Sequence, residues 1–131
     1  MNVKGSCLLA FDIPTQNSKH YIVIASDEMP DGKVLILPIS SIKPNKYHDS
    51  SCEFDVDEIK NEIGQNLLSK PSYIRYNEAR EISSSIILNK QIQKIYKYKC
   101  KISDEVLLKI QNGAKHSDEF ADYFKKYFDY F

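Results

Sequence analysis

The stretch PSYIRYNEAREIS, residues 71–83, predicts one long strand that bends near Asn77 and Glu78. On an unbroken strand, side chains alternate between the two faces, so Arg75 and Arg80, five residues apart, would point in opposite directions. A bend or bulge between them brings both toward one concave surface. Two guanidinium groups, an amide and a carboxylate in so short a stretch then suggest a site for a phosphate-bearing ligand. The alternative interpretation is an edge strand whose polar face is simply solvated.

Four further strands are expected on either side of this stretch. Runs of apolar and β-branched residues, or alternation of apolar and polar residues, mark each of them. Their approximate ranges are 5–11, 21–26, 34–39 and 95–101. The connections are too short for the crossovers that parallel strands need. The pattern therefore predicts an α+β fold based on a small, strongly bent antiparallel β-barrel.

Helices are expected mainly after the strands, packed on the barrel. Ser103 resembles an N-cap because acidic residues fill the turn that follows it, and Asn112-Gly113 is expected to end that helix. A second helix, rich in aromatic residues, is expected over 118–131. Two shorter helical segments are predicted at 56–63 and 84–89.

The chain of 131 residues, 42% of them hydrophobic, fits a single domain with one core. We expect the barrel to occupy about residues 3–101 and the C-terminal helices about residues 103–131. The 18 basic residues are balanced by 18 acidic ones. This balance argues against a broadly basic nucleic-acid-binding surface, but it leaves room for a local basic groove.

Cysteine and histidine usage bears on location and cofactors. The three cysteines, Cys7, Cys52 and Cys100, form no CxxC pair, and the three histidines complete no metal-binding pattern. No apolar stretch approaches the roughly 20 residues of a membrane span, and no secretory leader pattern is present. We therefore expect a cytoplasmic protein with reduced thiols, Cys7 and Cys100 buried as small hydrophobes, no cofactor, no metal and no membrane partner.

The candidate site begins at the ends of two predicted strands. His20 lies beside Lys19 at the start of the second strand, where it can act as a general acid or base near neutral pH. Ser40 and Ser41 end the third strand, where their hydroxyls can donate to a phosphate. The alternatives are a half-exposed strand-end histidine and a pair of turn-forming serines. His48, in a polar loop, is assigned no role.

The sequence contains no GxSxG, P-loop or HExxH motif. Together with Arg75, Asn77 and Arg80, the four residues at the strand ends instead form a metal-free set. Such a set suits RNA cleavage by internal attack of the 2′-hydroxyl. That reaction needs a base for the hydroxyl, an acid for the leaving oxygen and cations for the charge on the phosphorane.

Three blocks, GSCLLAFDIPT (5–15), KVLILPISSI (33–42) and RYNEAREIS (75–83), occur in an order and spacing found in a known family. They resemble the opening strand with its Asp-x-x-Pro-Thr-type loop, the strand ending in Pro-(Val/Ile)-Thr-Ser, and the Asp-Gln-x-Arg-x-(Ile/Val)-Asp stretch of MazF/PemK toxin endoribonucleases. A helix similar to SDEVLLKI follows the last strand in both. The likeness covers about residues 5–112.

The resemblance implies an SH3-like barrel of the MazF/CcdB type and metal-independent endoribonuclease activity of the mRNA interferase kind. It also implies single-stranded RNA, such as mRNA, as substrate, a homodimer, no cofactor, and a cognate antitoxin with a segment lying in the RNA groove. In this interpretation His20 is the acid/base, and Lys19 and Arg75 stabilise the phosphorane. The residues expected to bind and position the substrate are Ser40, Ser41, Asn77 and Arg80.

This chain departs from the family pattern at two places. Lys19-His20 replaces the usual Arg-Pro pair, which keeps a cation but loses the guanidinium fork. Asn77 stands where some members have a catalytic Asp, and because an amide cannot act as a base, proton abstraction falls to His20. These departures favour the alternative of a catalytically degenerate barrel that binds a protein or a nucleic acid. A third interpretation makes the aromatic segment 118–131 a partner surface.

Overall fold

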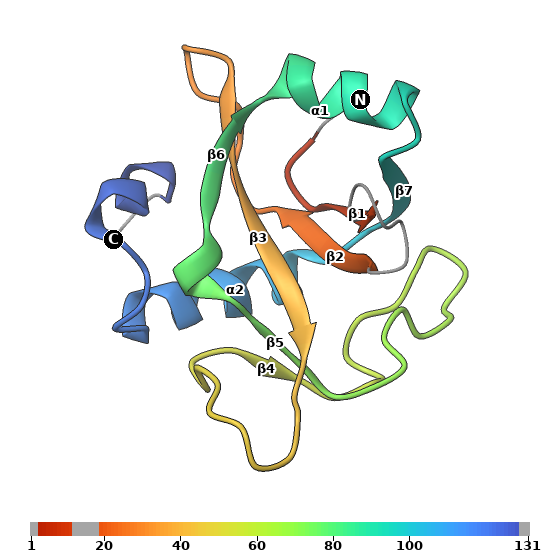
Figure 1. Ribbon diagram of the computed structural model, residues 1–131, viewed down its shortest axis with the longest axis vertical. Coiled ribbons are helices and arrows are strands. Elements are labelled where there is room, and N and C mark those ends of the chain that lie inside the picture. Colours follow the sequence, from red (N-terminus) through yellow and green to blue (C-terminus); the bar gives the residue numbers. More distant parts are fainter. Residues whose placement is uncertain (1–2, 12–18, 129–131) are drawn as a thin grey trace.

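Lys33–Ser41 forms the nine-residue strand β3, and the other strands are arranged along its two edges (Figure 1). One edge pairs with β2 (Lys19–Ile24). The other edge pairs with β6 (Arg80–Ser83) over the first half of β3 and with β5 (Ser72–Ile74) over the second half. The predicted bend within residues 71–83 is confirmed, and it divides that stretch into two strands that share one partner.

The computed structural model describes residues 3–11 and 19–128. The loop predicted around residues 12–18 lies outside them. The remaining elements are β1 (Ser6–Phe11), β4 (Glu53–Phe54), the 3-10 turn η1 (Tyr76–Glu78), α1 (Ser84–Ile92), β7 (Tyr96–Lys101), α2 (Asp104–His116) and the 3-10 helix η2 (Asp122–Tyr127).

The α+β class and the antiparallel sheet are confirmed. The seven strands follow the order β4-β5-β3-β2-β1-β7, with β6 added on β3, and all neighbouring pairs are antiparallel. Within the described ranges, no pairing joins the end strands β4 and β7, so the sheet is not closed into a barrel.

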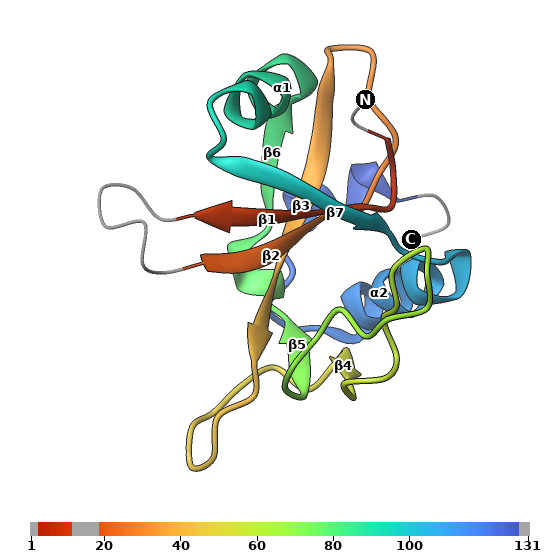
Figure 2. The ribbon, with the colours of Figure 1, turned by 90° about the vertical axis from the view of Figure 1, so that its right-hand side faces the viewer.

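Two clusters of buried side chains lie on opposite faces of the sheet, with α1 and α2 on different sides of it (Figure 2). Ile87 of α1 belongs to the smaller cluster, and Ile110 of α2 belongs to the larger one. Cys7 and Cys100 are fully buried and lie opposite each other on β1 and β7, as predicted for small hydrophobes. The sheet thus has an α1 face and an α2 face, and the site below depends on this distinction.

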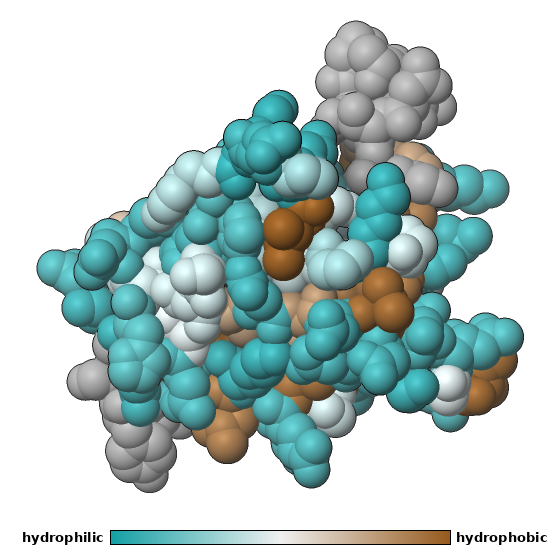
Figure 3. Space-filling view, turned by 90° about the horizontal axis from the view of Figure 1, so that it is seen from below, coloured by the Kyte–Doolittle hydropathy of each residue, from teal (hydrophilic) through white to brown (hydrophobic). Residues whose placement is uncertain are grey.

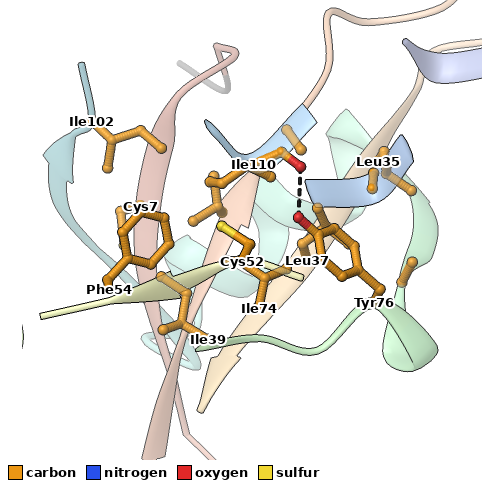
Figure 4. Packing of buried hydrophobic residues seen from close by; sticks show 14 of the residues in the cluster. Cys7, Leu35, Leu37, Ile39, Cys52, Phe54, Ile74, Tyr76, Ile102 and Ile110 are labelled. Atoms are coloured by element: carbon orange, nitrogen blue, oxygen red, sulfur yellow. Dashed lines mark hydrogen bonds between the residues drawn. The ribbon is translucent and has the colours of Figure 1, made fainter. Parts of the chain in front are cut away.

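Tyr76 anchors the junction between β5 and β6. The residue is 1% exposed and points into the larger cluster, where its hydroxyl donates a 2.6 Å hydrogen bond to the carbonyl oxygen of Ile110 (Figure 4). Burial raises the pKa of this hydroxyl far above its ordinary value, so it stays protonated and remains a donor. The 3-10 turn η1 therefore fixes the break in the stretch to α2.

The helix predicted over 56–63 is wrong. Part of the expected cap forms, because Glu58 Oε1 accepts a 3.0 Å hydrogen bond from the Asp55 amide. The chain then continues as turns and one isolated bridge. Ile59 is buried but Ile63 is 76% exposed, so the segment lacks the apolar stripe that a helix would bury.

The C-terminal helices also differ from expectation. Ser103 caps α2 as predicted, accepting a 3.2 Å hydrogen bond from the Val106 amide. The expected end at Gly113 is wrong, because α2 continues to His116. The second helix is the short 3-10 helix η2 rather than an α-helix, and α1 runs further than expected, to Ile92. Neither α-helix of the described chain has the length and apolar character needed to cross a membrane.

Glu81 of β6 holds the C-terminal segment on the sheet. Tyr123 and Tyr127 donate hydrogen bonds of 2.7 and 2.6 Å to its two carboxylate oxygens. Lys33 and Lys126 approach the same carboxylate at 3.9 and 3.7 Å. Tyr127 also enters the larger core cluster. The described part of the aromatic segment therefore packs on the sheet.

The Glu81 contacts predict a pH-dependent contribution to stability. Hydrogen bonds from Tyr127 and Tyr123 hold the pKa of Glu81 below its ordinary value of 4.5. A depressed folded-state pKa stabilises the fold above about pH 4.5, and this stabilisation is lost as the pH falls through the lower folded-state value. We expect Glu81→Gln to lower the urea midpoint at pH 7 but to differ much less from wild type at pH 3.

Urea unfolding followed by tyrosine fluorescence at both pH values checks this expectation. Glu28→Gln is the matched control, because Glu28 is exposed in the β2–β3 connection. A loss in Glu81→Gln that is equal at pH 7 and pH 3 would contradict the assignment.

Candidate functional site

A hollow of about 640 Å³ opens where β3 ends, between the connections 42–52 and 55–71. Residues from 43–48 line one side and residues 67–70 line another. Viewed from below, the molecule is mostly hydrophilic with isolated apolar patches (Figure 3). The volume lies within the range of small-ligand sites.

The hollow concentrates positive charge. Four cationic side chains line it, Lys43, Lys46, Lys70 and Arg75. No Asp or Glu is found among its lining residues in the described part of the chain. Because the formal net charge of the chain is zero, this is a local basic surface balanced by acids elsewhere. Such a surface favours an anionic ligand.

Strand register places the predicted chemistry in one row across the sheet. Ser40 lies directly opposite Tyr73. On its other edge, β3 pairs with β2, and the last pair of that register is Ile39 opposite Tyr21. Because the strands are antiparallel, the next residue of β3, Ser40, is the neighbour of the preceding residue of β2, His20. Cross-strand neighbours share a face and have Cβ atoms about 5 Å apart. His20, Ser40 and Tyr73 therefore form a row on the α1 face of the sheet.

Arg75 lies next to this row. Its amide donates a 3.0 Å hydrogen bond to the Pro38 carbonyl, which continues the β3–β5 register and puts its side chain on the same face as Ser40. Its Nη2 makes a 2.9 Å ion pair with Glu78 Oε1, and the Arg75 side chain is 36% exposed. A guanidinium carries five N–H donors, so this ion pair leaves donors for a phosphate.

His48 joins the same row from the connection 42–52. Its Nε2 contacts Glu53 Oε2, and its ring is tilted against Tyr73 with centroids 4.9 Å apart. Glu53 is the cross-strand partner of Tyr73, so all three side chains meet at one place on the sheet. A carboxylate on one ring nitrogen fixes the orientation and tautomer of an imidazole. His48 is thus an oriented imidazole at the hollow.

Asp49 fixes the loop that carries His48. Its carboxylate accepts hydrogen bonds from the Ser51 amide and hydroxyl, at 3.0 and 2.6 Å, and from the Ser117 hydroxyl at 2.5 Å. Burial opposes ionisation, but these hydrogen bonds outweigh it and hold the pKa of Asp49 below its ordinary value. The charged carboxylate ties the loop to Ser117, directly after α2.

The structure brings together four of the seven residues predicted from the sequence, namely His20, Ser40, Ser41 and Arg75. Asn77 and Arg80 are not among the lining residues. Arg80 does share the face of Arg75, because it pairs with Ile36, but it lies further from the hollow along β3. The backbone of Lys19 lies in β2, and its side chain is outside the described residues.

Sequence reasoning gave His48 no role and missed Tyr73 and the three lysines of the hollow. A signal was present in Lys43-x-x-Lys46-Tyr47-His48, where basic and aromatic residues are interleaved as in segments that bind nucleic acid. What the sequence does not reveal is that this loop folds back over β5, because the fold-back depends on Asp49 and on contacts with the end of α2.

No protein-family model matches the chain, and no curated protein sequence shows significant similarity to it. The function is therefore inferred from the site itself.

Proposed function

We propose that the chain binds single-stranded RNA in this hollow and cleaves it by attack of a ribose 2′-hydroxyl on the adjacent phosphate. One observation carries the proposal: four cations, two imidazoles and four serines line a hollow whose described lining contains no carboxylate. Cations attract the phosphates, and the tyrosines of the lining offer faces on which unpaired bases can stack.

The proposed reaction forms a bond between O2′ and phosphorus and breaks the bond between phosphorus and O5′. It gives a 2′,3′-cyclic phosphate and a free 5′-hydroxyl, and it consumes no water. His20 is assigned the proton transfer at the 2′-hydroxyl. Arg75 stabilises the additional negative charge of the phosphorane, and Ser40, the neighbour of His20, donates to a phosphate oxygen.

We further propose that this open sheet is related to the SH3-like barrel of the MazF/CcdB type, and that the chain acts as a cytoplasmic homodimer controlled by an antitoxin segment that competes for the hollow. Two of the blocks that carry the resemblance, 33–42 and 75–83, fall on β3 and on η1 with β6. The first block carries Ser40 and Ser41 at the end of β3, and the second begins with Arg75, and all three residues line the hollow.

Cleavage is tested with the purified chain, a mixed-sequence RNA and a chelator. We expect discrete fragments with 2′,3′-cyclic phosphate ends, and no cleavage of DNA of the same sequence. RNA that binds but stays intact would support the second candidate, a nucleic-acid-binding module without catalysis. The Arg75–Glu78 ion pair favours that candidate, because it partly neutralises the main phosphate ligand. A chain that neither binds nor cleaves RNA would contradict both candidate functions.

The lysines of the hollow give a separate prediction on binding. Each lysine that contacts a phosphate of single-stranded RNA contributes about 0.7 to the slope of log K against log salt. We therefore expect Lys43→Ala/Lys46→Ala to reduce this slope by about 1.4 and to weaken binding of a 2′-O-methyl RNA, which cannot be cleaved. Lys115→Ala, an exposed change on α2, is the control. An unchanged slope in the double variant would place the RNA elsewhere.

A further inference from the structure

We infer that His48, oriented by Glu53, is a second proton-transfer residue of this site and protonates the leaving 5′-oxygen. The inference rests on the proposed RNA cleavage and adds a residue from the loop 42–52, outside the strands that position His20, Ser40 and Arg75. It assigns Glu53 as the positioning residue for His48.

The register of the sheet places His48 at one end of the row that contains Ser40 and His20. Glu53, Tyr73 and Ser40 are successive cross-strand partners on β4, β5 and β3, and His20 is the neighbour of Ser40 on β2. The His48 ring rests against Tyr73 and contacts Glu53, so the row carries one imidazole at each end. Both imidazoles line the same hollow. A phosphate held near Ser40 would therefore lie between two groups able to move protons.

The contact between the His48 ring and the Glu53 carboxylate suits His48 to the role of acid. Glu53 engages Nε2, which leaves Nδ1 of His48 for a ligand in the hollow. The carboxylate also stabilises the positive charge that His48 carries when it is protonated. His20 lies at the other end of the row. No carboxylate among the described residues is assigned a corresponding role beside it. These features assign the acid to His48 and the base to His20.

The two imidazoles account for both proton transfers of the cleavage step. His20 accepts the proton of the 2′-hydroxyl as O2′ attacks phosphorus, and His48 gives its Nδ1 proton to O5′ as the bond between phosphorus and O5′ breaks. This division of labour also replaces the carboxylate base that Asn77 cannot supply. No oxidant, water or other co-reactant is consumed.

Several ionisable groups surround His48. Glu53 of β4 and Tyr73 of β5 contact its ring. The other charged or titratable groups that line the hollow with it are His20, Tyr21, Lys43, Lys46, Tyr47, Lys70 and Arg75. Because the base must be unprotonated and the acid protonated, the pH–rate profile of the wild type should be bell-shaped.

The test compares two RNA substrates that differ only at the leaving atom. One has the ordinary phosphodiester, and the other has a single 5′-bridging phosphorothiolate, whose sulfur leaves without being protonated. We expect His48→Ala to lower kcat by a factor of about 10² to 10³ on ordinary RNA. On the phosphorothiolate it should be within about fivefold of wild type, whereas His20→Ala should stay slow on both.

Two further variants separate a chemical role from a structural one. Glu53→Gln keeps a hydrogen-bonding side chain without the charge, so it should lower kcat on ordinary RNA by a larger factor than on the phosphorothiolate. His116→Ala, at the exposed end of α2, should leave both rates unchanged. Binding of 2′-O-methyl RNA and the near-ultraviolet circular dichroism should be preserved in His48→Ala.

The outcomes are distinguishable. Cleavage of ordinary RNA by His48→Ala at the wild-type rate, or a deficit of the same size on both substrates, would overturn the assignment while leaving the proposed function intact. A wild-type chain that cuts neither substrate would overturn the proposed function, and this assignment with it.

Discussion

Gly113→Ala is expected to destabilise the fold by about 3 kcal/mol, at the upper end of the cost of overpacking a core. A Cβ at this position would lie 2.3 Å from the Tyr76 hydroxyl oxygen, 2.7 Å from Cys52 Cβ and 2.9 Å from the Ser51 carbonyl oxygen. These backbone and core atoms cannot all move away from the added Cβ. The gain in helix propensity, about 1 kcal/mol, is too small to compensate. We expect a melting temperature roughly 10 °C lower, measured by circular dichroism.

A double-mutant cycle with Tyr76→Phe tests the mechanism. Phe removes the atom nearest to the added methyl, but it also removes the buried hydrogen bond to Ile110. Gly113→Ala/Tyr76→Phe should therefore lose less stability than the sum of the two single changes. Asn112→Ala, an exposed change one residue earlier in α2, should have an effect within about 0.5 kcal/mol. Strict additivity in the cycle would contradict a clash at Tyr76.

The effect should extend to the site. Ser51 and Cys52 lead directly into Glu53, and the Cys52 carbonyl accepts a 3.1 Å hydrogen bond from the Ile74 amide, directly before Arg75. A displacement of α2 from this segment would therefore disturb Glu53 and Arg75 together. Gly113 is thus a packing requirement beneath the site rather than a helix terminator.

Gly113 illustrates why some features could be predicted from the sequence and others could not. The strands and the break near Asn77 depend on side-chain alternation and on turn residues, which are local properties of the chain. The local sequence around a glycine near a possible helix end is the same in two cases: when the glycine caps the helix, and when it leaves space for a side chain from another element. Only the approach of Tyr76, 37 positions earlier in the sequence, distinguishes the two.

The site likewise contains residues that could be placed from the sequence and residues that could not. His20 and Ser40 could be placed together because their strands are neighbours along the chain, and Arg75 was joined to them by the charge pattern of residues 71–83 and by the resemblance. His48 could not, because its position depends on Asp49 holding the loop to Ser117, a contact between residues 68 positions apart. The helix predicted over 56–63 failed for a related reason: its cap is local and forms in part, but an apolar stripe for burial is missing.

Arg75→Ala is expected to lower kcat for RNA cleavage by a factor of about 10² to 10³, because it removes the guanidinium that the proposed mechanism assigns to the charge of the phosphorane. Binding of the uncleavable 2′-O-methyl RNA should also weaken, since Arg75 is one of four cations in the hollow. His20→Ala should cause a similar fall in kcat but leave this binding nearly unchanged, because a neutral base contributes little to holding phosphate. Single-turnover cleavage and fluorescence anisotropy separate the two effects.

Two further variants, chosen from the ion pair between Arg75 and Glu78, serve as comparisons for Arg75→Ala. Arg75→Lys keeps the charge but loses the fork, so it should recover binding more than rate. Glu78→Gln frees the guanidinium from its 2.9 Å partner and should tighten RNA binding without lowering kcat. If Glu78 instead held Arg75 in its productive position, Glu78→Gln would slow cleavage as Arg75→Ala does. Wild-type kcat in Arg75→Ala, with RNA cleavage established, would move the phosphorane-stabilising role to the lysines of the hollow.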